Sequence, residues 1–493
     1  MEELHEQERF RREKLVKYEE KGVDPFGQKF VRDHSSLDIK TRFANLTNEE
    51  LEGKENVVIA GRIMTIRNMG KAAFFHIKDK EGQIQVYLRK DVVGEEVYDL
   101  FNLADLGDIV GVEGKVMLTR TGELTVKCLK YTHLTKALRP LPEKFHGLSD
   151  VEERYRRRYV DLIVNDESRK IALTRPMILK TIKNFLDNKG YMEVETPILH
   201  PVLGGASAKP FITHHNALDM PFYLRIAPEL YLKRLIVGGL EKVYELNRNF
   251  RNEGISNRHN PEFTMLELYE AYGDLETMMD IVEEIFSLLV ERFSDSKVIT
   301  WRDAELDFSK GFRRVSMVEM IKEVTNIDFS KEMSDDEAIE IAKEKGLHLE
   351  EHEKNFGHIV NKMFEEFCED KLVQPTILYG HPSIISPLAR PSAKDNRFSE
   401  RFEIFINGVE FGNAYGELND PRIQKENFLN QLKEKDRGNE EATEMDKDYV
   451  EALEYGMPPT GGLGIGIDRV IMLFTNSDNI REVILFPHMR NRS

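Results

Sequence analysis

Residues 243–269 read VYELNRNFRNEGISNRHNPEFTMLELY, and this stretch predicts two strands joined by a loop. Apolar and polar side chains alternate over residues 243–253, which is the period of a strand with one apolar face. Residues 254–261, GISNRHNP, are typical of a loop, and the alternation resumes at Glu262. An antiparallel pair of strands is therefore expected here.

The polar faces of these two strands can lie together as one surface. A hydrated face is the simplest explanation for such a hairpin taken alone. This face, however, holds arginine, acids and aromatic rings in place of a mixture of Lys, Glu and Thr, and guanidinium groups suit fixed planar contacts with phosphate. The surface would carry Arg251, Glu253, Phe263, Glu267 and Tyr269, with Arg258 and His259 on the loop above it.

The composition is that of an ordinary globular chain. Its 493 residues suffice for two to four domains, each with its own core. No apolar run approaches the roughly 20 residues of a membrane span, and the start MEELHEQERFRREK is no signal peptide, so we expect a cytoplasmic protein with no membrane partner. Cys128 and Cys368 are too few for a disulfide framework and are expected to be free thiols. The net charge of -17 does not exclude a nucleic-acid partner, because an acidic body can carry a basic strip.

The first part of the chain predicts a helical extension followed by a small barrel. Residues 1–55 form the extension, whose segment 5–21 is either a solvated helix or a basic arm that holds RNA backbone. Residues 56–137 predict five strands with a helix after the third, which suits a Greek-key barrel of the OB type that binds oligonucleotides. Arg67, Phe74 and Gln85 would offer unpaired bases a guanidinium, a ring and an amide. Strand alternation allows only one of Phe74 and Phe75 to lie in the core.

Residues 138–155 contain prolines and little periodicity and are expected to be a linker. The remainder, residues 156–493, predicts an α+β domain. Within it, residues 275–370 are mostly acidic and helical in pattern and are expected to form an insertion.

Three further features of this domain could carry chemistry. Gly462, Gly464 and Gly466 recur at period two, so one face of their strand is bare backbone that a flat or charged ligand can approach, with Arg469 at the start of the next helix. A tight helix-on-strand crossing is the alternative explanation. The pattern is neither GxGxxG nor GxxxxGK[ST].

The other two features are acidic. Glu403 and Glu410 flank a turn at Asn407-Gly408 and could hold magnesium that carries nucleotide phosphates, although exposed strand carboxylates are the simpler explanation. Glu417 lies seven residues further on. Glu229 opens a helix after Pro228, where an acid that stabilises the helix dipole is a sufficient structural reason.

Together these pieces resemble one family. NFRNEG resembles the FRxE signature of the class II aminoacyl-tRNA synthetases, GLGIGIDR resembles their third motif, and GYMEVETPIL resembles the first, which forms their dimer interface. The OB-like domain precedes them, as in the Lys, Asp and Asn subgroup, and the class I signatures HIGH and KMSKS are absent. The resemblance implies an OB-type barrel, a catalytic domain with an antiparallel sheet flanked by helices, and a homodimer.

Within the subgroup, RIAPELYLKRL, LELYEAY and FGNAYGELND resemble the lysyl-tRNA synthetases of bacterial type. This resemblance implies a ligase that activates L-lysine with ATP to lysyl-adenylate and pyrophosphate, then transfers lysine to the 3′-terminal adenosine of tRNA(Lys). The residues also favour lysine, because an aspartate enzyme needs a cation at the base of its amino-acid pocket and this chain brings acids there.

The resemblance also implies roles for individual residues. Lysine would be bound by Gly205, Glu229, Arg251, Tyr269, Asn413 and Glu417. ATP would be bound by Arg251, Glu253, Arg258, His259, Phe263, Gly466 and Arg469. Arg251 and Arg469 would act in catalysis, Glu403 and Glu410 would hold Mg²⁺, and the anticodon would contact Arg67, Phe74 and Gln85.

Three alternatives stay open at this point. An aspartyl- or asparaginyl-tRNA synthetase has the same architecture but a different pocket. A lysine ligase that acts on a protein would not require an OB domain. A non-enzymatic RNA-binding protein would not need a complete set of ATP residues.

Overall fold

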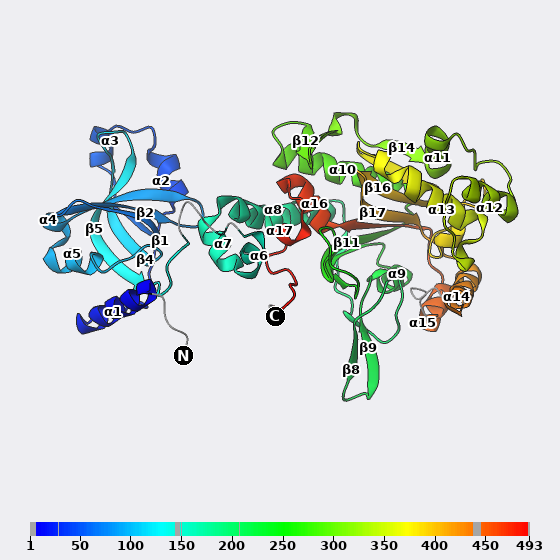
Figure 1. Cartoon of the computed structure of the whole chain (residues 1–493), viewed down its shortest axis with the longest axis horizontal. Helices are drawn as coiled ribbons and strands as arrows, with labels where there is room; N and C mark the ends of the chain where they lie inside the picture. Colours follow the sequence, from blue (N-terminus) through cyan, green and yellow to red (C-terminus); the bar gives the residue numbers. More distant parts are fainter. Residues whose placement is uncertain are drawn as a thin grey trace. The chain divides into compact units, whose positions relative to one another are not determined.

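The chain forms two compact units, Met1–Ser149 and Asp150–Ser493 (Figure 1). The computed structural model describes residues 6–491 except residues 28, 143–147, 149, 207 and 437–444, and it describes no side chains over 434–436. The predicted linker, 138–155, therefore falls partly outside the described residues. Helix α6, Val151–Arg156, begins within it.

The first unit contains the predicted five-stranded barrel. Its closed strand order is β1-β2-β3-β5-β4. Two short helices, α4 (Lys90–Val93) and α5 (Glu95–Phe101), follow the third strand, as predicted for an OB-type fold. The strands are β1 (Val57–Asn68), β2 (Ala72–Lys78), β3 (Gln83–Arg89), β4 (Ile109–Leu118) and β5 (Leu124–Thr135).

Alternation along β2 separates the two neighbouring phenylalanines, as predicted. Phe75 is fully buried, and its ring centroid lies 5.0 Å from that of Phe101. Phe74 points to the other face, is partly exposed, and stacks on Tyr87 with ring centroids 4.5 Å apart. The barrel core therefore uses one ring, and the outer face keeps the other.

Three helices precede the barrel: α1 (Glu6–Glu20), α2 (Ser36–Phe43) and α3 (Asn48–Glu52). Buried Arg11 of α1 donates to the carbonyl oxygens of Leu106 and Ala137 at 3.0 and 2.9 Å, and Lys14 pairs with Asp105 at 2.7 Å. Part of the basic character of α1 therefore fixes the helix to the barrel. Arg9, Arg12 and Lys17 remain exposed.

The second unit is built on an eight-stranded sheet with the order β14-β15-β16-β17-β18-β11-β10-β6. Only the two edge pairs, β14 with β15 and β6 with β10, run parallel. Its strands are β6 (Met192–Glu193), β10 (Lys242–Phe250), β11 (Glu262–Ala271), β14 (Arg313–Ser316), β15 (Thr376–Tyr379), β16 (Arg401–Ile406), β17 (Val409–Gly416) and β18 (Thr460–Gly466).

The two faces of the sheet are covered differently. Long helices α8 (Asp166–Asn188) and α10 (Leu275–Phe293) pack with α16 (Ile467–Thr475) against one face, in a core that includes Leu266 and Leu268 of β11. On the opposite face Tyr269 packs with α9 (Glu229–Val237) and α15 (Lys447–Glu454). The second face is covered only in part, and this leaves room for a cavity.

The remaining elements are short. A three-stranded sheet, β7-β9-β8, joins Leu199–His200, Met220–Leu224 and Ile212–His215, and a separate pair joins β12 (Val298–Trp301) to β13 (Ala304–Asp307). The other helices are α7 (Arg158–Val164), α11 (Met317–Thr325), α12 (Asp335–Glu344), α13 (Phe356–Phe367), α14 (Pro421–Asp436) and α17 (Ile480–Val483).

The block at 275–370 differs from the predicted insertion. Helix α10 carries an apolar stripe that packs into the main core, and β14 is an edge strand of the main sheet. Helices α11, α12 and α13 pack around a second core, to which Val315 of β14, Leu378 of β15 and Phe405 of β16 also belong. The acidic residues lie on the exposed faces of these elements. The acidic composition of 275–370 therefore could not indicate that the other face of α10 packs against the main sheet.

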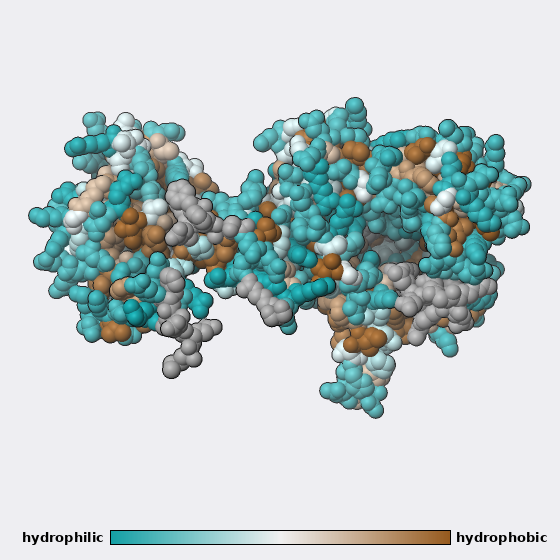
Figure 2. All heavy atoms as spheres, in the orientation of Figure 1, coloured by the Kyte–Doolittle hydropathy of each residue, from teal (hydrophilic) through white to brown (hydrophobic). Residues whose placement is uncertain are grey.

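Within the described part of the chain, no helix combines the length and the apolar character needed to cross a membrane. Hydrophilic residues cover most of the face shown in Figure 2.

Phe75→Ala should destabilise the barrel by roughly 3–5 kcal/mol, because it removes a fully buried ring and leaves a cavity. Phe74→Ala is the matched control, since it removes the same atoms from a partly exposed ring and should cost about 1 kcal/mol through the lost stacking on Tyr87. Differential scanning calorimetry of the full chain measures both changes. Equal shifts in Tm would contradict the assignment of Phe75 to the core.

Candidate functional site

A cavity of about 720 Å³ opens on the partly covered face of the sheet. Its walls come from β11, β16, β17 and β18, from the loop after β10, and from α13. It gathers all but one of the site residues predicted in this unit: Gly205, Glu229, Arg251, Glu253, Arg258, His259, Phe263, Tyr269, Glu403, Glu410, Asn413, Gly466 and Arg469. The exception is Glu417, which is fully buried behind the wall.

The predicted hairpin forms the centre of this site. β10 and β11 pair antiparallel with Glu245 opposite Glu267, and the backbone N–H of Arg251 donates to Pro261 O at 2.8 Å. β10 ends at Phe250, so Arg251 and Glu253 lie in the following loop and not in the strand as predicted. The polar face is not simply a solvent-exposed one, because Glu245 and Glu267 are only 2% and 6% exposed.

Buried Glu245 has a fixed cationic partner. Arg225, fully buried, donates from Nη1 to Glu245 Oε1 at 2.7 Å and from Nε to Arg248 O at 2.9 Å. Thr196 Oγ1 donates to the second oxygen of Glu245 at 2.6 Å. Because Glu245 is the cross-strand partner of Glu267, this network lies beside Glu267 on the cavity side of the sheet. It was not predicted, because no local pattern links Arg225 to Glu245.

The loop end of the cavity is cationic. The Arg251 guanidinium carbon lies 5.1 Å from the Phe263 ring centroid, and Arg251 Nε is buried with no hydrogen-bond partner among the described residues. His259 shares a hydrogen bond of 2.9 Å with Ser256 Oγ, and burial and Arg469 lower its pKa. An anionic ligand would supply the missing acceptor for Arg251.

The glycines of β18 serve two different purposes. A Cβ on Gly461 would lie 3.0 Å from the Met278 side chain of α10, so this glycine permits a close helix-on-strand contact. A Cβ on Gly462 would lie 2.0 Å from Glu417 Oε1 and 2.6 Å from the Tyr269 ring, on the cavity side. The close helix contact thus explains Gly461, which is not one of the three glycines of the predicted pattern. The approach of a ligand to the face of Gly462, Gly464 and Gly466 stays a prediction.

Helix α16 begins where β18 ends and presents Arg469 to the cavity. Arg469 Nη1 donates to the backbone oxygen of Glu410 and lies 3.8 Å from its carboxylate. The neighbouring Asp468 has a structural contact: it pairs with Arg175 of α8 at 2.6 Å and accepts from Thr264 N at 2.7 Å. Asp468 thus ties α8, α16 and β11 together, and Arg469 is left to face the cavity.

Glu403 and Glu410 lie on β16 and β17, which join at the predicted Asn407-Gly408 turn. They are not direct cross-strand partners, since Glu403 pairs with Asn413 and Glu410 with Phe405 across a bulge. Both nevertheless line the cavity.

The two carboxylates differ in their surroundings. Glu403 accepts from Arg401 at 2.7 Å and lies 3.2 Å from the buried His381 ring. Although burial acts in the opposite direction, His381 and Arg401 lower the pKa of Glu403 to about 2. Burial and the adjacent Glu403 raise the pKa of Glu410. A hard cation between the two carboxylates would relieve this repulsion. No group of three His, Cys, Asp or Glu ligands occurs in the described residues. The pair nevertheless fits Mg²⁺, which commonly binds one or two protein carboxylates and takes its other ligands from phosphate oxygens.

The opposite end of the cavity is acidic. Glu229 opens α9, as predicted, and accepts from Lys233 Nζ at 2.5 Å one turn later. Lys233 also pairs with Glu417, and both of these side chains are fully buried. Burial and Glu229 raise the pKa of Glu267 to about 8, and Tyr269 donates to Glu267 at 3.3 Å.

Lys233 was not predicted as part of the site. The sequence did contain a signal, because Glu229 and Lys233 are spaced i,i+4 on a helix that begins at Glu229. Gly205 and Asn413 lie in the same region. Gly205 has φ +90°, and Asn413 donates to Tyr415 at 3.0 Å and accepts from Arg401 at 3.2 Å.

The predicted base-binding residues lie together in the first unit. Arg67 is exposed and pairs with Phe74 across β1 and β2. Gln85 is buried on β3; its amide donates to Glu123 at 2.8 Å and accepts from Thr125 Oγ1 at 2.8 Å. Arg67 and Phe74 are accessible to a base, whereas Gln85 is held by internal partners.

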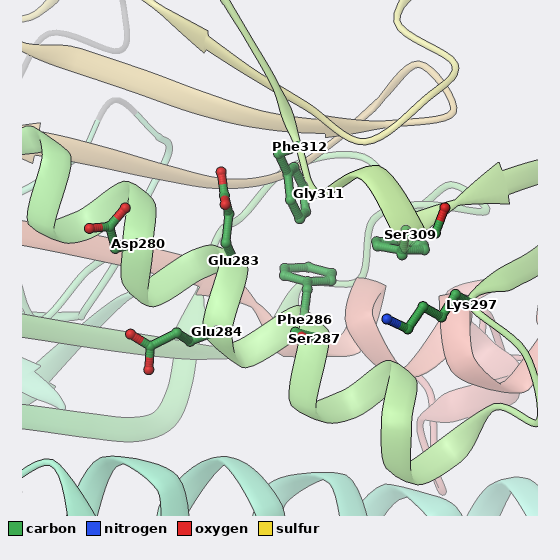
Figure 3. A pocket seen from close by; sticks show the side chains of 10 residues that line it. Asp280, Glu283, Glu284, Phe286, Ser287, Lys297, Ser309, Gly311 and Phe312 are labelled. Carbon is green, nitrogen blue, oxygen red and sulfur yellow. The ribbon is translucent and has the colours of Figure 1, made fainter.

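A second, smaller cavity of about 450 Å³ lies beside α10. Figure 3 shows Asp280, Glu283 and Glu284 projecting from this helix near Phe286 and Phe312. Arg314 pairs with Asp280 at 2.9 Å and with Glu283 at 3.1 Å, which neutralises part of this acidic wall. None of the predicted site residues lines it.

Comparison with known proteins agrees with this geometry. The family of class II tRNA synthetases (D, K and N) matches residues 150–490, and the OB-fold nucleic acid binding domain matches residues 57–134. A protein of Lysinibacillus sphaericus named lysine--tRNA ligase is 56% identical over 493 residues, covering 100% of this chain and 98% of its own length. Proteins with the same name from Bacillus cytotoxicus and Bacillus mycoides are each 56% identical over 492 residues, with the same coverage. The chain therefore belongs to the class II tRNA synthetases of the Asp, Lys and Asn group.

Proposed function

We propose that this protein is a lysine--tRNA ligase, which activates L-lysine with ATP and transfers it to tRNA(Lys). The observation that carries the proposal is the division of one cavity into a cationic end, with Arg251, Arg258 and Arg469, and an acidic end, where Glu229 and Glu267 line the cavity and Glu417 is buried behind Gly462. Lysine has one carboxylate and two ammonium groups, which match the two ends. The relatives named lysine--tRNA ligase support the same substrate.

At the acidic end, Glu417 and Tyr269 would bind the side-chain ammonium of lysine, and Glu229 would bind its α-ammonium. Gly205 and Asn413 would shape the same pocket. Glu267 lies beside Glu229 and Tyr269, although sequence reasoning gave it no role. A site built to pair with an ammonium rejects a neutral analogue, because its buried carboxylates would be left without a partner.

In the first step, a lysine carboxylate oxygen forms a bond to the α-phosphorus of ATP, and the bond from this phosphorus to pyrophosphate breaks. The carboxylate is ionised at neutral pH, so the step requires no general base. Catalysis then depends on positioning and on stabilising the charge that develops between the two substrates. Arg251, whose Nε has no partner among the described residues, would bridge the carboxylate and the α-phosphate.

The rest of ATP fits the remaining walls of the cationic end. Phe263 and Arg469 would hold the adenine between them, Gly466 would admit its flat face, and Glu253 would accept from its amino group. Arg258 and His259 would bind the triphosphate. Glu403 and Glu410 would hold Mg²⁺, which neutralises phosphate charge when bound.

In the second step, a hydroxyl of the 3′-terminal adenosine of tRNA attacks the lysyl carbonyl carbon, and AMP leaves. Arg67, Phe74 and Gln85 of the barrel would contact the anticodon. The accessible Phe74 ring, already stacked on Tyr87, supports base stacking. Gln85 would need to exchange the bonds it makes to Glu123 and Thr125.

We further propose that the protein acts in the cytoplasm as a homodimer. Large apolar side chains of the first motif and the helix before it are exposed in the single chain: Met177 is 48% and Met192 is 53% exposed. Burial of these side chains against a second copy would remove apolar surface from water.

Arg251→Ala should lower lysine-dependent exchange of pyrophosphate into ATP by about 100-fold or more, because a preorganised charge at the reacting phosphate is lost. The exchange rate at saturating lysine and ATP measures this change, and the Tm of the variant checks that the fold is intact. Exchange at the wild-type rate would exclude this role for Arg251.

Glu417→Gln should raise the KM for lysine by about tenfold or more and leave the KM for ATP within about twofold, because a charged partner of lysine is lost while the ATP end is unchanged. Steady-state exchange with each substrate varied in turn measures both constants. A parallel rise in the two constants would contradict the assignment of Glu417 to the lysine end.

Phe74→Ala should leave pyrophosphate exchange unchanged and reduce the kcat/KM for charging tRNA by about 5- to 100-fold, which is the loss expected for one stacked base. Aminoacylation of total tRNA with labelled lysine measures this effect. Unchanged charging would remove Phe74 from the anticodon surface.

A further inference from the structure

Lys233 occupies an unusual position at the acidic end of the cavity. Its side chain is fully buried, and its ammonium bridges Glu229 Oε1 and Glu417 Oε2, two carboxylates proposed to bind the substrate. Burial alone would lower the pKa of Lys233, but Glu229 and Glu417 raise it well above its usual value. The protein therefore holds an ammonium of its own beside the place proposed for the ammonium groups of lysine.

Each of the two carboxylates has an oxygen that Lys233 does not use. Glu417 Oε1 is buried and accepts from no donor in the described part of the chain. It lies behind Gly462 and Tyr269, both of which line the cavity. Glu229 itself lines the cavity. The unpaired oxygen of Glu417 is thus separated from the cavity only by a glycine and a tyrosine ring.

The number of charged groups at the acidic end explains why a buried lysine is needed there. Three carboxyl groups, those of Glu229, Glu267 and Glu417, meet at this end, and burial raises the pKa of Glu267 and of Glu417 to about 8, so their ionised forms are disfavoured near pH 7 unless cations pair with them. Bound lysine brings two ammonium groups for the three. Lys233 supplies the third positive charge. Without it, one buried carboxylate would remain unpaired in the complex, and burial of an unpaired charge is strongly unfavourable.

Other groups around Glu417 are neutral or acidic. Those that face it are Glu229 and Lys233 of α9, Glu267 and Tyr269 of β11, Tyr415 of β17 and Tyr449 of α15. Arg225 affects Glu267 but is committed to Glu245. Lys233 is thus the cation among the described groups that acts directly on Glu417.

We propose that Lys233 is a positioning residue for the lysine pocket: its ammonium holds one oxygen of Glu229 and one of Glu417, favours the ionised form of Glu417 against burial, and leaves the second oxygens for the substrate. This inference rests on the proposed lysine--tRNA ligase function. In the proposed function, Lys233 contacts neither ATP nor the reacting atoms. It acts through the two carboxylates.

The test is the pH dependence of kcat/KM for lysine in pyrophosphate exchange between pH 6 and 9, with the full-length protein. Lys233→Met removes the charge and keeps a chain of similar length. Because loss of an adjacent cation raises the pKa of a carboxylate, the rise of kcat/KM should move upward by about one pH unit or more, and the KM for lysine should increase about tenfold at pH 7. The KM for ATP should stay within about twofold of the wild-type value.

Lys233→Arg is the matched control, because it keeps the positive charge and should keep the wild-type pH profile. Lys233→Gln replaces Lys233→Met if the Met variant is not recovered folded, and it should show the same upward displacement. A purely structural role of Lys233 would lower Tm and kcat without moving the pH profile. An unmoved profile in the neutral variants, or equal rises in KM for lysine and ATP, would overturn the proposal.

Thermal unfolding separates this proposal from the proposed function. Lys233→Met should raise the folded-state pKa of the buried Glu417 further above its unfolded value. The contribution of Glu417 to the free energy of unfolding is then present at low pH and is lost as the pH rises through the folded-state pKa. Its Tm should fall relative to wild type between pH 6 and 9. Absence of lysine-dependent exchange in the wild type would overturn the ligase function, while a parallel Tm profile would overturn the charge role of Lys233.

Discussion

The pleat of β11, between β10 and β18, imposes the constraint on which the site depends. Successive side chains point to opposite faces of a sheet, so Leu266 and Leu268 enter the core under α8 and α10 while Glu267 and Tyr269 face the cavity. A slip of one residue in the register would bury the acids in the core and expose the leucines. The same pairing places Gly464 opposite Glu267 and Gly462 opposite Tyr269, which clears space in front of the functional side chains.

This arrangement buries several charged side chains, and each of them forms an ion pair with a neighbouring side chain of opposite charge. Arg225 pairs with Glu245 on the cavity side of the sheet, Arg175 with Asp468 at the start of α16, and Lys233 with Glu229 and Glu417 at the end of the cavity. Removal of one partner from a buried pair commonly costs about 3–5 kcal/mol, so these pairs fix side chains in place more than they add net stability. Rigid carboxylates are what an ammonium-binding site requires, because substrate binding then does not have to order them.

The sequence predicted those features that follow from short-range pattern. Alternation identified the 243–269 hairpin, the division between Phe74 and Phe75, and the glycine face of β18. Features that depend on distant contacts were missed. The Arg225 partner of Glu245 and the packing of α10 on the main sheet leave no local signal, and an acidic stretch such as 275–370 has the same composition whether or not its other face is buried. Residues 251–253 were assigned to a strand because the alternation continues past the point where pairing with β11 stops.

The site residues were predicted mostly through resemblance, and the limit of that approach is clear at Glu417. Its position in FGNAYGELND identified it, but only the fold reveals that its carboxylate lies behind Gly462 and is already paired with Lys233. Solvent-exposed acids at one end of a cavity would attract any cation, including inorganic ions from the solvent. Acids that are buried, partly neutralised by Lys233 and approached past a tyrosine ring favour a ligand that brings ammonium groups at fixed separation and replaces water around them. In the proposed function, the Arg251 end binds a carboxylate, so the two ends together would select a diamino acid by charge and by length.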